Sequence, residues 1–135
     1  SNLQQVTKGN TIDTIRTAQL KVVYDKAKRE KKLAEPPLVV NHQSCVYNGL
    51  LFVRSGLIGR FEDRKMWNQA SVIDVYSITD RAYVASFYVY HIDQKKASRF
   101  FVHHDSFYAF IGTKLVRYTL TDMITSAYPP SNDTK

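Results

Sequence analysis

The sequence predicts an all-β fold made of antiparallel four-stranded meanders, and two observations lead to this prediction. Short runs rich in Tyr, Phe, Val and Ile alternate along the chain with groups of polar turn residues. The 135 residues include 9 Tyr and 7 Phe but 5 Gly and 4 Pro, so most turns must use Asn, Asp, Ser and Thr. A hydrophobic content of 44% is enough for a globular core in a chain of this length.

An internal repeat orders these runs. Residues 46–53 resemble residues 102–109, an offset of 56 (102 − 46), and each segment reads as a strand, a short polar turn and a second strand. Residues 73–79 resemble residues 115–121, an offset of 42 (115 − 73). Because the offset falls by 14 (56 − 42), the first copy contains 14 additional residues, which we assign to 57–70.

A weaker third match relates residues 79–87 to residues 7–15, an offset of 72 (79 − 7). This match predicts a separate fourth strand at about 11–16, ahead of the two units. The predicted order is then this orphan strand, a full unit of four strands at about 42–90, and a unit of three strands at about 98–121.

We therefore divide the chain into three parts. Residues 1–41 contain the orphan outer strand and a charged run, KAKREKK at 26–32, which forms either the tip of a hairpin or a short helix. Periodicity over so few residues does not distinguish these two alternatives. Residues 42–122 contain the two meander units, and residues 123–135 are expected to be an irregular tail.

A repeated four-stranded meander is the pattern of a β-propeller blade. One blade cannot bury both of its faces, so several blades stack around a common axis. Two units do not complete such a ring. The sequence therefore predicts about two propeller-blade-like units in an incomplete ring, which either belong to a larger propeller or assemble with other copies of the chain.

Four segments carry a resemblance to a known family: NGLLFVRSG, MWNQASVIDVYSI, AYVASFYVY and FFVHHDSFYAFIGTKLVRYTL. Together they resemble the C-terminal blades of the six-bladed β-propeller proteins of Bacteroidetes, over about residues 10–121. The resemblance implies a propeller fold and a periplasmic or cell-surface location. It implies little about activity, because these proteins are largely uncharacterised and the wider class contains both binding scaffolds and enzymes.

The additional residues of the first unit are the main candidate for a binding surface. Two strand crossings return the chain to the same side, so this insert should lie beside the loop at 91–96. Long loops on a rigid scaffold often bind ligands, and Trp and Arg are common at binding hot spots. An alternative is that the insert only packs on its own unit. The candidate ligand- or partner-binding residues are Arg60, Phe61, Arg64, Lys65, Trp67, His91 and Lys95.

Other reactive residue types do not form a catalytic or metal-binding pattern, and no cofactor is expected. In the group His103-His104-Asp105, His104-Asp105 aligns in the repeat with the plain turn at Asn48-Gly49, and adjacent histidines in a strand point to opposite faces. Asp74, inside an apolar strand, is expected to accept structural hydrogen bonds from backbone or Arg groups between blades. Cys45 is the single cysteine and is expected to be a small buried hydrophobic residue.

These observations favour a non-enzymatic binding or interaction module with a protein or carbohydrate ligand. The first alternative is that the chain is part of a propeller enzyme, a lyase or glycosidase, whose active site lies at the ring centre. The net charge of +7 suggests a nucleic-acid-binding β protein as the second. The charge run at 26–32 has one aromatic neighbour, Tyr24, so nucleic acid is not the expected partner. No apolar run is long enough to span a membrane.

Overall fold

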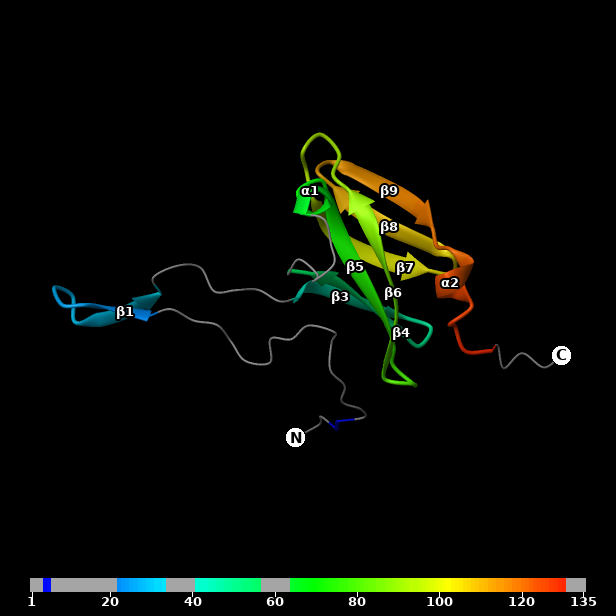
Figure 1. The fold of residues 1–135 in the computed structure, drawn as a ribbon, viewed down its shortest axis with the longest axis horizontal. Coiled ribbons are helices and arrows are strands. Elements are labelled where there is room, and N and C mark those ends of the chain that lie inside the picture. Colours follow the sequence, from blue (N-terminus) through cyan, green and yellow to red (C-terminus); the bar gives the residue numbers. More distant parts are fainter. Residues whose placement is uncertain (1–3, 6–21, 34–40, 57–63, 131–135) are drawn as a thin grey trace.

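The structure, a computed structural model, describes residues 4–5, 22–33, 41–56 and 64–130. Within these ranges the chain is all-β, with one two-stranded, one four-stranded and one three-stranded antiparallel sheet and two helices of a single turn (Figure 1). The predicted fold class is confirmed: consecutive strands form meanders, and the described strands do not close into a ring.

The two-stranded sheet is a hairpin of β1 (Val22–Asp25) and β2 (Glu30–Leu33). The charged run forms the turn and most of the second strand, so a hairpin is present here, although the run extends beyond its tip. In Figure 1 this hairpin stands apart from the other two sheets. The predicted orphan strand at 11–16 lies outside the described residues.

The four-stranded sheet corresponds to the predicted full unit. Its strands are β3 (Asn41–Tyr47), β4 (Leu50–Ser55), β5 (Ala70–Ser77) and β6 (Ala82–Tyr90), paired in that order. The turn between β3 and β4 is Asn48-Gly49, with φ of 48° and 78°. Left-handed φ values at both central residues match the twist of a tight hairpin, and Asn and Gly accept them readily.

The three-stranded sheet corresponds to the predicted second unit. Its strands are β7 (Ala97–His103), β8 (Ser106–Ile111) and β9 (Lys114–Thr119), again paired in order. No fourth described strand pairs with β9. Instead the chain enters α2 (Asp122–Thr125).

The strand pairings of the two sheets have the same register. In the first two strands every pair is shifted by 56, so that Val46↔Leu51 corresponds to Val102↔Phe107. Each first strand contains a bulge at the same point, between residues 41 and 43 and between residues 97 and 99. The third strands differ by 42, since Ser77 pairs with Leu50 and Thr119 with Ser106.

This shared register lets us define corresponding faces. We define the front face of the four-stranded sheet as the side that carries Gln43, Cys45, Tyr47, Leu50, Phe52, Arg54, Ile73 and Val75. This side packs on the opposite, back face of the three-stranded sheet, which carries Phe100, Val102, Phe107, Ala109, Ile111, Val116 and Tyr118. The two sheets therefore stack front to back, and the front face of the three-stranded sheet points away from the core.

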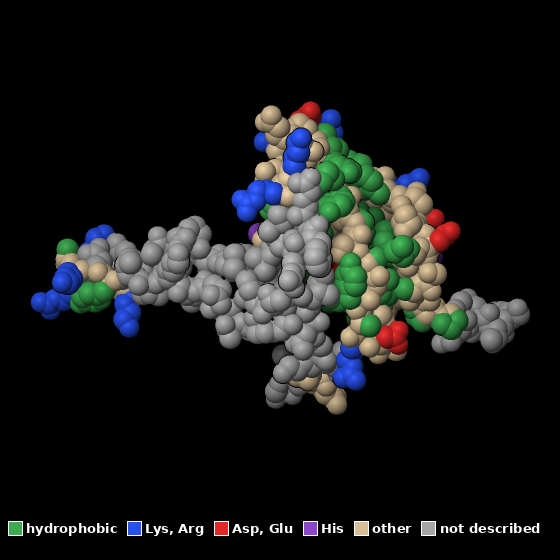
Figure 2. Space-filling view, in the orientation of Figure 1, with side chains coloured by type: hydrophobic (Ala, Val, Ile, Leu, Met, Phe, Trp, Pro, Cys, Tyr) green, Lys and Arg blue, Asp and Glu red, His purple; other side chains and the backbone are tan. Residues whose placement is uncertain are grey.

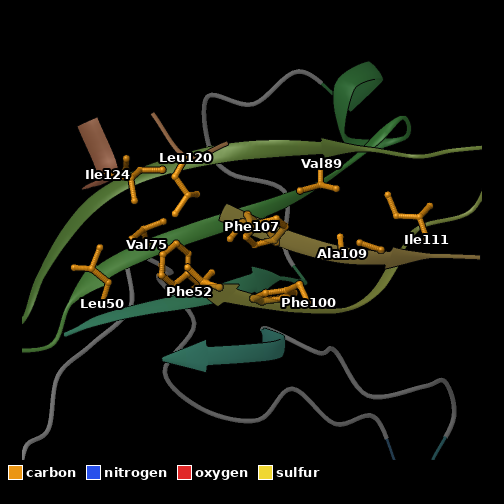
Figure 3. Close-up of a cluster of buried hydrophobic side chains, with 14 residues drawn as sticks. Leu50, Phe52, Val75, Val89, Phe100, Phe107, Ala109, Ile111, Leu120 and Ile124 are labelled. Atoms are coloured by element: carbon orange, nitrogen blue, oxygen red, sulfur yellow. The ribbon is translucent and has the colours of Figure 1, made fainter. Parts of the chain in front are cut away.

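The core lies between these two faces (Figure 3). Phe107 of β8 is fully buried, with Phe87 of β6 edge-on at 5.0 Å between ring centroids and Phe100 of β7 stacked at 5.1 Å. Burying a side chain of this size stabilises the fold by about 1.5–3 kcal/mol. The aromatic runs of the sequence thus become one core shared by both sheets.

The C-terminal segment closes the core on the side of β6. Leu120 and Ile124 are buried between β6 and β9, beside a hollow of about 290 Å³. The expectation of an irregular tail from residue 123 is therefore wrong for its first residues, because burying Ile124 favours a helical turn there. Farther on, the Tyr128 hydroxyl donates to the His104 carbonyl oxygen at 2.6 Å.

Candidate binding site at the loop end

The β4–β5 connection and the β6–β7 turn meet at one end of the four-stranded sheet. The described part of the connection contains α1 (Arg64–Trp67), and the backbone N–H of His91 donates to the carbonyl oxygen of Gln69 at 2.8 Å. The prediction that the insert and the loop at 91–96 lie together is thus confirmed for the residues described. The placement of the connection's residues 57–63 is outside the described ranges.

A small cavity of about 100 Å³ lies beneath α1. Its described lining residues are His42, Arg54, Ser55, Trp67, Ala70, Ser71 and Lys96. His42 is the residue that the bulge in β3 leaves out of the strand pairing. Bulges commonly redirect a side chain in this way, and here the redirected imidazole joins the wall of the cavity.

A second, more open hollow of about 480 Å³ adjoins it. Its described lining residues are Asn68, Gln69, Tyr90, His91, Gln94 and Lys96. Lys96 lines both spaces, so they form one continuous surface, which we call the basic rim. Lys and Arg side chains gather beside α1 at this end of the molecule (Figure 2).

The basic rim is electrostatically positive. Burial, followed by the charges of Arg54 and Lys96, lowers the pKa of His42 below its usual 6.5. Burial and Lys96 likewise lower the pKa of His91. Both shifts favour the neutral imidazole, and the positive charge of the rim is carried by Arg54 and Lys96. Among the described lining residues of the two spaces there is no carboxylate.

Two buried nitrogen atoms at the basic rim have no hydrogen-bond partner in the described part of the chain. They are Nε of Arg54 and Nε2 of His91. The other end of the Arg54 guanidinium is held in place, because its Nη1 donates to the carbonyl oxygen of Ala97. Unsatisfied buried polar atoms are costly and uncommon, so a polar ligand that paired with them would gain free energy.

The structure brings together some of the predicted site residues. Trp67 lines the small cavity and His91 the open hollow. Arg64 and Lys65 are exposed on α1. The Lys95 backbone pairs with Ile92, and its side chain packs over Gly112. Arg60 and Phe61 lie outside the described residues.

Sequence reasoning missed three residues of the basic rim: His42, Arg54 and Lys96. Arg54 lies in a strand where alternation places it on the same side as Leu50 and Phe52, so its position next to the core could have been derived. The bulge that redirects His42 has no comparable signal in the sequence.

The other polar residues singled out in the sequence have structural surroundings. His103 ends β7 and His104 occupies the turn with φ of 54°, matching the 48° of Asn48, so the predicted turn is confirmed. No group of three metal-ligating side chains occurs within the described ranges. Burial raises the pKa of the Cys45 thiol to about 11.

Asp74 is 4% exposed and accepts a hydrogen bond of 2.5 Å from the Ser86 hydroxyl. Ser86 in turn lies 2.7 Å from the Tyr83 hydroxyl. This partner belongs to the neighbouring strand of the same sheet, whereas the sequence argument expected backbone or Arg partners between blades. A hydroxyl can take this role because Asp74 and Ser86 are directly opposite each other in β5 and β6.

The comparisons with known proteins give no identity. No family model, curated protein or solved structure matches the chain. No helix in the described ranges is long and apolar enough to cross a membrane.

Proposed function

We propose that the chain is a non-enzymatic binding module built from two copies of a propeller-blade-type unit. The observation that carries this proposal is the front-to-back stacking of two sheets with one register. Two unrelated sheets in a sandwich have no corresponding faces, so nothing would favour a contact between the front face of one and the back face of the other. In a propeller, the front face of each blade packs on the back face of the next blade.

The basic rim supports a role in binding an anionic group. Arg54 and Lys96 supply positive charge, and the described lining contains no carboxylate to neutralise it. The unpaired Nε of Arg54 and Nε2 of His91 add hydrogen-bonding capacity. An acidic protein segment or an acidic carbohydrate, presenting a carboxylate, sulfate or phosphate, matches these features.

A binding role also agrees better with the rim than acid–base catalysis does. General acid–base catalysis in hydrolases and lyases commonly pairs groups with pKa values shifted toward the working pH. At the rim, burial and Lys96 move the pKa of His42 and His91 downward, away from neutrality. An enzyme site at a ring centre would need catalytic groups from further blades.

The test is an NMR titration of the His42 and His91 imidazoles with and without sulfate at constant ionic strength. Without sulfate both pKa values should lie below 6.5, and sulfate should raise both, because a bound anion favours the imidazolium form. Lys96→Ala should raise both pKa values without the anion and abolish the sulfate effect. Lys31→Ala, at an exposed position of the β1–β2 hairpin, is the matched control. Imidazole pKa values that sulfate leaves unchanged would contradict the anion site.

A further inference from the structure

The front face of the three-stranded sheet carries large aromatic side chains in solvent. Phe101 is 43% exposed, Phe110 41% and Leu115 56%, while Tyr108 is half-buried. Two exposed arginines lie on the same face. We call this surface the aromatic face and define it by Arg99, Phe101, Tyr108, Phe110, Leu115 and Arg117.

The strand register gives the layout of the aromatic face. Phe101, Tyr108 and Arg117 form one row across β7, β8 and β9. The next row is Arg99, Phe110 and Leu115, in the same strand order. Tyr108 and Phe110 therefore lie in the middle, on β8, and the two arginines occupy diagonally opposite corners, with Phe101 and Leu115 at the other two.

The corresponding positions of the four-stranded sheet show how the aromatic face has diverged. Those positions are covered by the back face of the neighbouring sheet. There, Val75 corresponds to Arg117 and Gln43 to Arg99 (shifts of 42 and 56). An arginine in place of a fully buried valine would leave a charge inside a sheet-to-sheet contact, which is strongly unfavourable. The aromatic face is thus suited to a hydrated, negatively charged partner rather than to another sheet.

The size of the aromatic face supports the same choice. The two rows cover three residues along each strand and three strands across, which gives about 10 Å by about 14 Å, or roughly 140 Å². Stable protein complexes bury roughly 800 Å² on each partner. Aromatic side chains on the surface of a β-sheet are also the feature with which some RNA-binding domains stack two or three bases.

The charge of the surrounding strands is one-sided. β7, β8 and β9 contain Arg99, Arg117 and Lys114 and have no Asp or Glu. Lys114 lies opposite Ile111 and pairs with Asp93 at 3.5 Å, so the charge of the aromatic face comes from the two arginines. The ring of Phe101 stacks on that of Tyr108 at 4.7 Å between centroids and 12° between planes, and lies 6.5 Å from Phe110. Aromatic rings held on a rigid sheet and flanked by arginines match a ligand that has both flat rings and negative charge.

We propose that the aromatic face binds single-stranded nucleic acid, with bases on Phe101, Tyr108 and Phe110 and phosphates on Arg99 and Arg117. The charge run at 26–32 argued against such a partner because Tyr24 is its one aromatic neighbour, but the fold collects arginines and aromatic residues elsewhere. The proposal rests on the chain being a binding module, as proposed above, and uses a surface different from the basic rim.

The test is fluorescence anisotropy of the full chain with labelled oligo(dT) and oligo(U) of about ten nucleotides, a length within the usual site size. Tyr108→Ala and Phe101→Ala should each weaken binding by about 5- to 150-fold, the range for loss of one stacked base. Arg117→Ala should lower the slope of log K against log salt by about 0.7, the share of one phosphate contact on a single strand. Arg117→Lys should keep that slope.

Lys96→Ala is the control for Arg117→Ala, because it removes the same charge but lies at the basic rim. It should leave the contribution of the aromatic face to oligonucleotide binding intact. Circular dichroism of each variant confirms that the sheets have formed. Three outcomes overturn the proposal: no binding at low salt, equal weakening by Lys96→Ala and Arg117→Ala, or binding that the Tyr108 and Phe101 variants do not weaken. A mass that rises with concentration and falls to the monomer in Phe101→Ala, without oligonucleotide binding, would instead show that another copy covers this face.

The sulfate titration and the oligonucleotide experiment test the two proposals independently. Loss of the sulfate effect on the imidazoles contradicts the function proposed for the basic rim and leaves oligonucleotide binding unaffected. Loss of oligonucleotide binding contradicts the role of the aromatic face alone.

Discussion

The front faces of the two sheets occupy corresponding positions but have opposite surroundings. On the four-stranded sheet the front face is covered, with Phe52, Ile73 and Val75 fully buried. On the three-stranded sheet the matching positions are Tyr108, Leu115 and Arg117, and they face solvent or lie at its edge. The same backbone pattern therefore supports a core surface in one unit and a potential binding surface in the other, and the side chains alone decide between them.

Exchanging the residues at the corresponding positions 75 and 117 should change the free energy of unfolding more than the other variants below. Val75→Arg places a charge in the core between the sheets, and we expect it to lower the free energy of unfolding by about 3–5 kcal/mol or to prevent folding. The reciprocal change, Arg117→Val, should stay within about 0.5 kcal/mol because that side chain is exposed. Urea denaturation of both variants measures the difference. Similar losses in the two would show that the stacking direction assigned here is incorrect.

Shortening one phenylalanine on each side of the three-stranded sheet should give the next largest effect. Phe107→Ala removes a fully buried ring from the centre of the core, and we expect a loss of about 3–5 kcal/mol. Phe101→Ala, on the exposed face of the same sheet, should cost about 1 kcal/mol or less. Thermal and urea unfolding check both values. An equal cost at the two positions would mean that the aromatic face is covered in solution.

Much of this arrangement could be predicted from the sequence, because strand periodicity and repeat offsets are local properties. The shift of 56 located the paired hairpins at 41–55 and 97–111, and strand counting placed the insert next to 91–96. The stacking direction could not be derived in this way, because alternation identifies two faces of a strand without showing which is covered. Val75 and Arg117 indicate the answer only once the two sheets are seen in contact.

Two other features depend on contacts that are distant in the sequence. Ile124 looked like part of an irregular tail, since one apolar residue among polar neighbours carries little weight. It is buried between β6 and β9, at the edge of the second sheet where no fourth described strand pairs with β9. The basic rim likewise joins His42, Arg54 and Lys96, which belong to three different segments.

Removing the hydroxyl that holds the C-terminal segment should have a moderate effect. Tyr128→Phe deletes the bond to the His104 carbonyl oxygen, and we expect a loss of about 0.5–1.5 kcal/mol at pH 7. Burial raises the pKa of Tyr128 to about 12, so its contribution is present below pH 10 and is lost as the pH rises through 12. The stability advantage of the wild type over the variant should therefore shrink as the pH rises from 10 toward 12. An advantage that stays constant over this range would contradict this account.

The smallest effect on stability concerns Cys45, which corresponds to Phe101 but faces the core. With a pKa of about 11 the thiol stays protonated at pH 8, so we expect it to react with a disulfide reagent much more slowly than a free thiol of pKa 9. The raised pKa also means that any stabilisation by the neutral thiol is present below pH 9 and is lost as the pH rises through 11. Unfolding in urea should restore the ordinary reaction rate at pH 8, and Phe101→Cys gives the matched exposed thiol on the other front face. If Cys45 in the folded chain reacts as fast as that exposed thiol, the front face of the four-stranded sheet is not covered.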